Sequence, residues 1–316
     1  MSLKPSNNSN LSDKKDLTDT IKAKALSLGF SAIGITKAEA VDEITATHFH
    51  QWIDEGKHAG MDYMCNNVDK RLDPRLLMDN TKSIVSVALN YYPQRHISEE
   101  QYQISYYAYG KDYHEIIKGK LHALAEGLYL TNYRAFCDTA PILERYWAVK
   151  AGLGWIGRNH QLIIPNAGST FFLGELLLDI ELEYDSEQQN RCGNCHSCLD
   201  SCPTNAIQGN KELDANRCLS YLTIENRGEI PEELASKMGN YIYGCDRCIL
   251  SCPWSRFATP TTEPELQPSE EIFRLTKEQW CNLTIEEYRQ IFKKSAVKRA
   301  KYEGLMRNIR AINKRY

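Results

Sequence analysis

Two cysteine runs constrain this chain of 316 residues more than any other feature. The first run reads Cys192-x2-Cys195-x2-Cys198-x3-Cys202-Pro203, and the second reads Cys245-x2-Cys248-x3-Cys252-Pro253. The first run has the spacing that holds a [4Fe-4S] cluster on three cysteines and passes the fourth cysteine to a second cluster. The two runs therefore predict a small domain that carries two iron–sulfur clusters.

The cysteine count identifies one more ligand. Two [4Fe-4S] clusters need eight thiolates, and the runs supply seven, because Ile242 stands where the second run should begin with a cysteine. Cys218, between the runs, is the natural eighth ligand. If the last cysteines of the two runs are exchanged, two ligand sets are predicted. They are Cys192, Cys195, Cys198 and Cys252 for one cluster, and Cys202, Cys218, Cys245 and Cys248 for the other.

A pair of zinc sites is the alternative for these runs, because paired C-x2-C spacings also bind zinc. Zinc does not need the x3-Cys-Pro step that occurs in both runs, so iron–sulfur clusters are favoured. Disulfides are not expected, because cytosolic thiols stay reduced. Three cysteines outside the scheme, Cys65, Cys137 and Cys281, are interpreted as ordinary buried thiols. Clusters ligated only by cysteine transfer electrons, so the substrate reaction is expected in another domain.

Upstream of the cysteines, helical and strand patterns alternate, which predicts an α/β layered domain. Helices are expected at 15–29, 42–55, 112–130 and 142–151, strands at 32–36, 83–89 and 134–137, and a glycine-bearing loop with two further strands after Gly152. The predicted division of the chain has four parts. They are a disordered tail (1–14), the α/β catalytic domain (15–185), a ferredoxin-like [4Fe-4S] domain (186–258), and a linker with a short helical C-terminal segment (259–316).

Neither a dinucleotide-binding loop nor a membrane segment is expected. Gly152, Gly154 and Gly157 have the G-x-G-x-x-G spacing, but they follow a helix and not a strand, so a tight turn is favoured. The polar N-terminus has no apolar segment typical of a secretory signal, and acidic residues interrupt the best apolar run, 171–180. We therefore expect a cytoplasmic protein with no membrane partner.

The net charge of −3 hides a basic C-terminal tail, because residues 293–315 hold nine Lys or Arg against one acid, Glu303. Such a tail is either a solvated helix face or a contact surface for an anionic partner. Phe292, Tyr302 and Tyr316 are interleaved with the basic residues, which favours contact with RNA and binding that weakens as salt rises.

Several blocks, from about residue 15 to the end, resemble the epoxyqueuosine reductase family. They read KRLDPR (70–75), YAYGKDYH (107–114), DTAPILERYWA (138–148), KAGLGWIGRN (150–159), CLSYLTIE (218–225) and YGCD (243–246). The resemblance implies an oxidoreductase that reduces epoxyqueuosine to queuosine in the tRNA anticodon loop. It also implies that an external donor sends electrons through two [4Fe-4S] clusters to cobalamin, which the layered N-terminal domain binds.

The resemblance assigns roles to individual residues. It places the proton donor on Asp138, and it places cobalamin contacts on Arg71, Ser105, Asp138, Leu162, Leu173, Ser220 and Asp246. From the residues alone, Asp138 could instead cap the helix that follows, with Thr139 and Pro141 in its first turn. Conversion of an epoxide to an alkene consumes two electrons and two protons, so an acid is needed. A strand-end carboxyl in an apolar pocket is expected to have a raised pKa that keeps it protonated.

Other residues have two interpretations. Arg71 could be a plain surface cation instead of a corrin contact, and Glu144 and Arg145 could form a pair on a helix surface. Asp112-x-His114 comes nearest to a D-x-H-x-x-G motif, but the glycine is missing. The resemblance therefore implies cobalamin without a protein histidine on cobalt.

Two rival functions are weighed against this reading. One is a cobalamin-dependent reductase of small molecules like the reductive dehalogenases, which would normally carry a twin-arginine export signal that is absent here. The other is a pure electron carrier, which would not need the N-terminal domain. Many members of the family continue into a helical-repeat region beyond the part that this chain matches, so the tRNA contacts on that side stay open.

Overall fold

A four-stranded sheet forms the centre of the N-terminal half. In this computed structural model, which describes residues 7–209 and 212–314, the strands have the order β1-β2-β7-β4, and every neighbouring pair is antiparallel. Their bounds are β1 (Ala32–Lys37), β2 (Ser83–Asn90), β4 (Tyr133–Phe136) and β7 (Phe171–Leu178). The central strands β2 and β7 are buried along almost their whole length, which requires protein layers on both faces.

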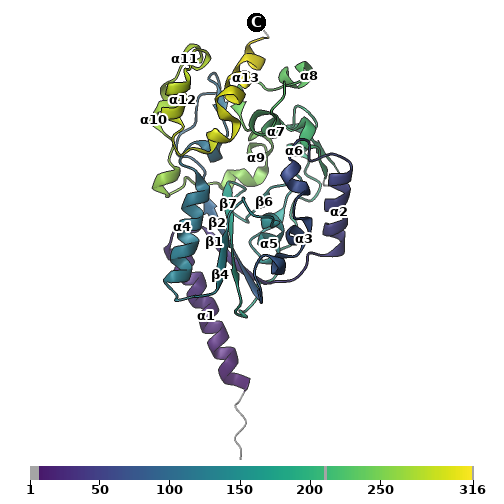
Figure 1. The fold of residues 1–316 in the computed structure, drawn as a ribbon, viewed down its shortest axis with the longest axis vertical. Coiled ribbons are helices and arrows are strands. Elements are labelled where there is room, and N and C mark those ends of the chain that lie inside the picture. Colours follow the sequence, from purple (N-terminus) through teal and green to yellow (C-terminus); the bar gives the residue numbers. More distant parts are fainter. Residues whose placement is uncertain (1–6, 210–211, 315–316) are drawn as a thin grey trace, which may run out of the picture.

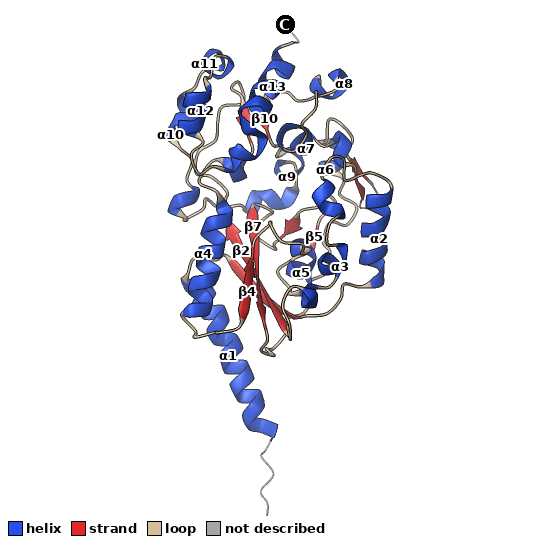
Figure 2. Ribbon diagram, in the orientation of Figure 1, coloured by secondary structure: helices blue, strands red, loops and turns tan. Residues whose placement is uncertain are grey.

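Helices supply these layers (Figures 1 and 2). On one face, α1 and α4 contribute Ile21 and Leu121 to an apolar cluster with Leu176 of β7. On the other face, α5 contributes Trp147, which packs against Leu177. This arrangement fits the expected layered architecture. The helices of this half are α1 (Asn7–Ser27), α2 (Glu43–Asp54), α3 (Val68–Leu72), α4 (Tyr113–Glu126) and α5 (Glu144–Lys150).

The cysteine-rich region and the C-terminal segment form a second, largely helical lobe above the sheet in Figure 2. Its apolar core combines Leu222 and Tyr243 from the cysteine-rich region with Trp280 and Leu305 from the C-terminal segment. Tyr102, which lies upstream within the expected catalytic domain, also belongs to this core. The lobe is therefore assembled from three separate parts of the chain.

The remaining elements are short. The helices are α6 (Ser197–Asp200), α7 (Leu219–Ile224), α8 (Glu232–Ala235), α9 (Arg247–Leu250), α10 (Glu270–Arg274), α11 (Lys277–Cys281), α12 (Ile285–Ile291) and α13 (Lys301–Asn313). The strands are β3 (Gln103–Ile104), β5 (Trp155–Ile156), β6 (Leu162–Ile163), β8 (Ile207–Gln208), β9 (Glu212–Leu213) and β10 (Tyr241–Tyr243).

Two local expectations can be compared with this fold. Residues 7–14 were expected in a disordered tail, but they begin helix α1, and Lys14 pairs with Glu181 at 2.8 Å; residues 1–6 lie outside the described residues. The glycines after α5 form a tight turn into the β5–β6 hairpin, since a Cβ on Gly154 would lie 2.0 Å from the carbonyl oxygen of Ile163. Among the described residues, no helix has both the length and the apolar character needed to cross a membrane.

Candidate active site and cluster-binding region

Asp138 lies two residues beyond the end of β4, which finishes beside the middle of β7. Its φ of +58° is in the left-handed region, which Asp tolerates better than most residues do. Helix α5 begins only at Glu144, and its N-cap position, Leu143, makes no side-chain capping bond. The interpretation of Asp138 as an N-cap is therefore wrong, because an open turn separates it from the helix.

The start of α4 holds the Asp138 carboxylate in place. Its Oδ2 accepts a hydrogen bond from the Tyr113 hydroxyl at 2.5 Å and lies 3.3 Å from Nε2 of His114. Nδ1 of His114 lies 2.6 Å from Oδ1 of Asp112, which also caps α4 by accepting from the His114 backbone N–H. His114 thus bridges two aspartates, and its sequence context predicted neither contact.

These contacts set the protonation of the pair. Burial raises the pKa of Asp138, but hydrogen bonds from His114 and Tyr113 outweigh burial, and the net pKa is lowered. Burial lowers the pKa of His114, but hydrogen bonds to Asp112 and Asp138 raise it to about 9. The expectation of a protonated Asp138 is therefore wrong for this state of the protein, because a cationic partner stabilises the carboxylate more than burial penalises it.

The Asp138 side chain is 59% exposed, although the protein around it still partly desolvates the carboxyl. The Asp138 backbone N–H donates to Oε1 of Glu144 at 2.5 Å, so Glu144 is not simply one half of a surface pair. Burial and the nearby Asp138 charge raise the pKa of Glu144 to about 7. Arg145 donates to the carbonyl oxygen of His160 and lies near both acids. The site therefore places two carboxyls beside the Arg145 guanidinium, one with a lowered pKa (Asp138) and one with a raised pKa (Glu144).

Arg71 is not the plain surface cation of the alternative interpretation, because it is buried at the end of α3. One guanidinium nitrogen donates to the Tyr63 carbonyl oxygen at 3.3 Å, while the buried Nε has no hydrogen-bond partner among the described residues. The guanidinium also lies over the Phe49 ring, 6.0 Å from its centre. No carboxylate appears among these contacts, so Arg71 is available to an anionic or carbonyl-bearing ligand.

The other predicted cofactor residues fall into separate groups. Ser105 and Asp246 are both buried, and the Tyr106 backbone N–H donates to Asp246 at 2.8 Å. Burial raises the pKa of Asp246, hydrogen bonds from the Tyr106 backbone and the Ser105 side chain lower it, and the net pKa is about 6. Leu162 and Leu173 share one apolar cluster next to α5. Ser220 lies in α7 and is half-buried. Among the described contacts, none joins Arg71 or Ser220 to the other two groups.

The first predicted ligand set gathers around Cys198. Burial raises the pKa of the Cys198 thiol, and three neighbouring thiols raise it further. Those neighbours are Cys252, Cys192 and Cys195. Cys252 comes from the second cysteine run, so α6 and α9 bring the two runs together at this point.

The second predicted set gathers around Cys248. Burial raises the pKa of the Cys248 thiol well above its usual value, and other thiols raise it further. Those thiols are Cys245, Cys218 and Cys202. Within residues 7–209 and 212–314, no three His, Cys, Asp or Glu side chains converge on a position for a single metal ion. Of the three cysteines outside the scheme, Cys137 is buried as expected, Cys281 is half-buried, and Cys65 is exposed, contrary to expectation.

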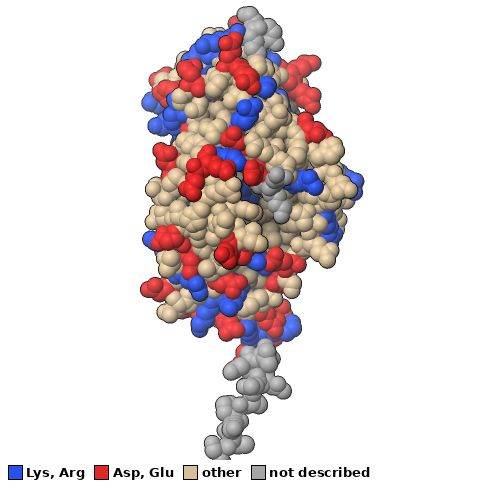
Figure 3. Space-filling model, turned by 90° about the vertical axis from the view of Figure 1, so that its right-hand side faces the viewer, with Lys and Arg blue, Asp and Glu red and all other residues tan. Residues whose placement is uncertain are grey.

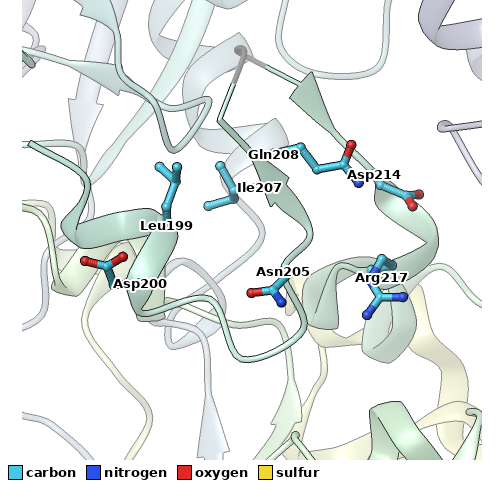
Figure 4. A pocket seen from close by; sticks show the side chains of 7 residues that line it. All are labelled: Leu199, Asp200, Asn205, Ile207, Gln208, Asp214 and Arg217. Atoms are coloured by element: carbon cyan, nitrogen blue, oxygen red, sulfur yellow. The ribbon is translucent and has the colours of Figure 1, made fainter. Parts of the chain in front are cut away.

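An open hollow of about 670 Å³ lies in the cluster-binding lobe and not at Asp138 (Figure 4). Its lining consists of Leu199, Asp200, Asn205, Ile207, Gln208, Asp214 and Arg217. None of these was predicted as a site residue. Nε of Arg217 donates a hydrogen bond to the Thr204 carbonyl oxygen at 2.8 Å, so one of its donors already serves the fold and is not available to a ligand.

The basic C-terminal tail is partly structural. Phe292 is 2% exposed and stacks near Trp280 in the core, so its expected contact with RNA is wrong. Arg307 is buried and donates to the carbonyl oxygens of Asn226, Gly228 and Leu222. Tyr316 lies outside the described residues. The exposed cations of the tail are Lys293, Lys294, Lys298, Arg299, Lys301, Arg310 and Lys314. On the face shown in Figure 3, Lys and Arg are interspersed with Asp and Glu.

Two family models match the chain. Residues 191–255 match the 4Fe-4S double cluster binding domain, which favours iron–sulfur clusters over zinc, and residues 71–139 match a model described as "Epoxyqueuosine reductase QueG, DUF1730". The second range contains Arg71, His114 and Asp138. The family models thus cover the cysteine runs and the segment that holds Asp112, His114 and Asp138.

Whole proteins of the same family match almost the full chain. The epoxyqueuosine reductase of Cellulophaga algicola is 45% identical over 303 residues, which cover 95% of this chain and 99% of the relative. The Escherichia coli enzyme is 38% identical over 94% of this chain and 80% of its own length. A crystal structure of epoxyqueuosine reductase with an epoxyqueuosine-modified tRNA-Tyr stem loop has a TM-score of 0.87 at 29% identity, and it covers 94% of this chain and 80% of that one. Sequence and fold agree over nearly the whole length, and the chain belongs to the epoxyqueuosine reductase family.

Proposed function

We propose that this protein is an oxidoreductase that reduces epoxyqueuosine to queuosine in the anticodon loop of tRNA. The observation that carries the proposal is 45% identity to an epoxyqueuosine reductase along 99% of that relative. Because the alignment covers 95% of this chain, it takes in both the cysteine runs and the acid network, which consists of Asp138 and the titratable side chains around it. A tRNA substrate also agrees with the predicted cytoplasmic location.

The test is a reaction with anaerobically reconstituted protein, tRNA that carries epoxyqueuosine, and a chemical reductant. After digestion to nucleosides, mass spectrometry should show that the modified nucleoside has lost one oxygen atom. Unchanged epoxyqueuosine after incubation with protein that holds its full complement of iron and cobalamin would contradict the proposal.

Iron–sulfur clusters are the first cofactors of this proposal. The match to a double-cluster domain and the two groups of thiols around Cys198 and Cys248 support two [4Fe-4S] clusters. The first group would comprise Cys192, Cys195, Cys198 and Cys252, and the second Cys202, Cys218, Cys245 and Cys248. An external electron donor would be needed to recharge them.

Cobalamin is the second proposed cofactor, and the residues present fit it. Arg71 Nε is buried and has no hydrogen-bond partner among the described residues, and the same holds for the hydroxyls of Ser169 and Thr170 and for Nε1 of Trp155. Buried polar groups normally have partners, and the amide and phosphate groups at the rim of a corrin would supply them. Leu162 and Leu173 would offer an apolar surface. When bound, cobalamin and the clusters would together supply the two electrons of the reaction.

The chain's own residues would supply protons. An alkoxide leaves poorly until it is protonated, and at neutral pH the proton beside Asp138 resides on His114. We therefore assign proton delivery to the His114–Asp138 pair, in which Asp138 takes the proton from His114 and presents it to the departing oxygen. Tyr113 and Asp112 hold the two side chains in position.

The tRNA would be held partly by the exposed cations of the tail. Lys298 and Arg299 lie in a short helical turn, and Arg299 lies over the Tyr63 ring, 5.7 Å from its centre. Arg299 also forms two hydrogen bonds with Glu225. Because Tyr63 is also close enough to Asp138 to be affected by its charge, this part of the tail lies on the same side of the molecule as the acid network.

A further inference from the structure

Glu175 is a glutamate at the centre of the sheet, where apolar residues are usual. It is fully buried in β7, where it lies opposite Ser86 of β2 and Phe136 of β4. Residues directly opposite each other in antiparallel strands point to the same face, and this face is covered by α5, which contributes Trp147 and Glu144. A carboxyl at the middle of a four-stranded sheet has no structural purpose in packing, since an apolar residue would fill the position at lower cost.

Neither carboxyl oxygen of Glu175 has a hydrogen-bond partner among the described residues, and the opposing Ser86 hydroxyl has none either. Burial of an unpaired carboxylate costs several kcal/mol, so such a group stays protonated instead. Accordingly, burial raises the pKa of Glu175 well above its usual value, and the Glu144 and Asp138 charges raise it further. Glu175 therefore holds a proton at neutral pH.

Glu144 links this buried acid to the site. The Glu144 and Glu175 carboxyls are close enough for each to affect the other's pKa, although their geometry falls short of an ordinary hydrogen bond. On its other side, Glu144 accepts the hydrogen bond from the Asp138 backbone. Glu144 is half-buried, so it connects the sealed interior with the open surface at Asp138.

The reaction needs more protons than the pair at Asp138 holds. Reduction of the epoxide consumes two protons with its two electrons, one for the departing oxygen and one to complete the water. The His114–Asp138 pair carries a single shared proton at neutral pH. We propose that Glu175 stores the second proton and passes it to Glu144, so that the buried and the half-buried carboxyl together act as the proton reserve of the site.

In this transfer the O–H bond of Glu175 breaks, an O–H bond forms on Glu144, and no electrons move. The proton leaves Glu144 for the product water, and solvent restores it along the same route. The inference rests on the proposed function, which supplies the two electrons. Glu175 and Glu144 would be positioning and proton-storing residues behind Asp138.

The titratable groups around the two carboxyls come from several elements. Asp138 and the buried thiol of Cys137 lie after β4, and Arg145 lies in α5 next to Glu144. From α4, Tyr113 responds to the charge of Glu144, and Lys118 donates to Thr139 beside the site. Among the described residues, Arg145 is the cation next to Glu144, Lys118 lies near Cys137, and the charged His114 lies on the far side of Asp138. No ion pair to Glu175 occurs among them, so titration near neutral pH falls on Glu144.

The first experiment detects the stored proton without any turnover. Infrared difference spectroscopy of the full chain, titrated in H2O and D2O, should show the C=O stretch of a water-shielded carboxylic acid that survives to alkaline pH. Glu175→Gln should remove that band, while Ser86→Ala, which changes the opposing side chain without removing an acid, should keep it. Absence of such a band in the unmodified protein, or its persistence in Glu175→Gln, would overturn the proposal.

The second experiment asks whether the proton is used. In single-turnover reactions with tRNA that carries epoxyqueuosine, Glu175→Gln should match the parent at low pH but lose about tenfold in rate on the alkaline side. A small acid in the buffer should restore part of that loss. Because Gln has nearly the same shape, iron and cobalamin content report whether the variant has folded. An unchanged pH–rate profile would overturn the inference, whereas an inactive parent protein would overturn the proposed function itself.

Discussion

The cluster-binding region and the acid network around Asp138 organise their chemistry in opposite ways. Each cysteine run places three or four thiols within eleven residues of one another, so the spacing alone indicates what they bind. The acid network takes its members from α4, the turn after β4, α5 and β7, with Asp112 and Glu175 at the two ends. Short spacing along the chain identifies the cysteines that bind a cluster. The protonation state of the acids depends instead on which groups, far apart along the chain, the fold brings together.

A second contrast lies within the acid network itself. Asp138 and Glu144 are six positions apart and in contact, yet the pKa of Asp138 is lowered and that of Glu144 is raised to about 7. Asp138 has His114 as a cationic partner, while burial and a neighbouring negative charge act on Glu144. Two acids so placed can divide the roles of proton acceptor and proton store.

The largest expected effect is that of Asp138→Asn. Asn tolerates a positive φ and can accept from Tyr113, so the fold, clusters and cobalamin binding should survive. Turnover of tRNA with epoxyqueuosine should fall by roughly 10²–10⁴-fold, as is typical when a positioned proton donor is lost. The measurement is nucleoside mass spectrometry on protein of verified iron and cobalamin content. Turnover near the parent rate would exclude Asp138 from the catalytic role and would leave no functional difference between Asp138 and Glu144.

A smaller effect is expected for stability in His114→Gln. The folded pKa of His114 is raised to about 9, so its stabilising contribution is complete below the unfolded value of about 6.5 and is lost as pH rises through about 9. The variant should therefore lose roughly 1–3 kcal/mol of unfolding free energy at pH 6 and much less at pH 10. Urea unfolding at the two pH values tests this.

The matched control for this variant is His122→Gln on the same helix, where His122 contacts only the Tyr133 hydroxyl at 3.0 Å among the hydrogen bonds described. This control should lose little at either pH. Equal losses by both variants would show that the acid network does not hold His114 in its charged form.

The cluster side of the comparison is tested by Cys218→Ala. Anaerobic protein should hold about eight irons, and the variant should keep roughly half, because only one of the two clusters loses a ligand. Iron analysis and the absorption spectrum give the answer. Cys281→Ala is the control, since Cys281 contacts Asn313 and lies outside both ligand sets. Retention of all iron in Cys218→Ala would disprove its assignment as the eighth ligand.

The smallest expected effect is on RNA binding by the basic C-terminal tail. Lys298 is exposed, so Lys298→Gln should weaken binding of an anticodon stem-loop by about twofold and lower the salt slope by about one. Fluorescence anisotropy at several salt concentrations measures both. Lys14→Gln, at an ion pair with Glu181 near the N-terminus, should leave binding unchanged. Equal effects of the two substitutions would indicate a general charge effect and no local RNA contact.

The chemistry that depends on near neighbours along the chain could be predicted from the residues alone. The cysteine spacing predicted an iron–sulfur domain, which the match to a double-cluster model supports. It also predicted the two ligand sets, and the pairing of Cys198 with Cys252 stays a prediction, although thiols of both runs lie close enough to raise one another's pKa. Alternating patterns predicted most helices and strands of the layered half, and the family resemblance carried the reaction. Such features can be predicted because hydrophobic period and ligand spacing are local properties.

The charge states and the contacts of individual side chains, in contrast, depend on the folded arrangement. It overturned the raised pKa expected for Asp138, because His114 folds against it. It buried Phe292 and Arg307, which the pattern of the tail had assigned to its surface. It also brought Glu175 close to Glu144. In the sequence, Glu175 only interrupts an apolar run. Desolvation and through-space electrostatics depend on distances between groups far apart along the chain, and no local pattern encodes those distances.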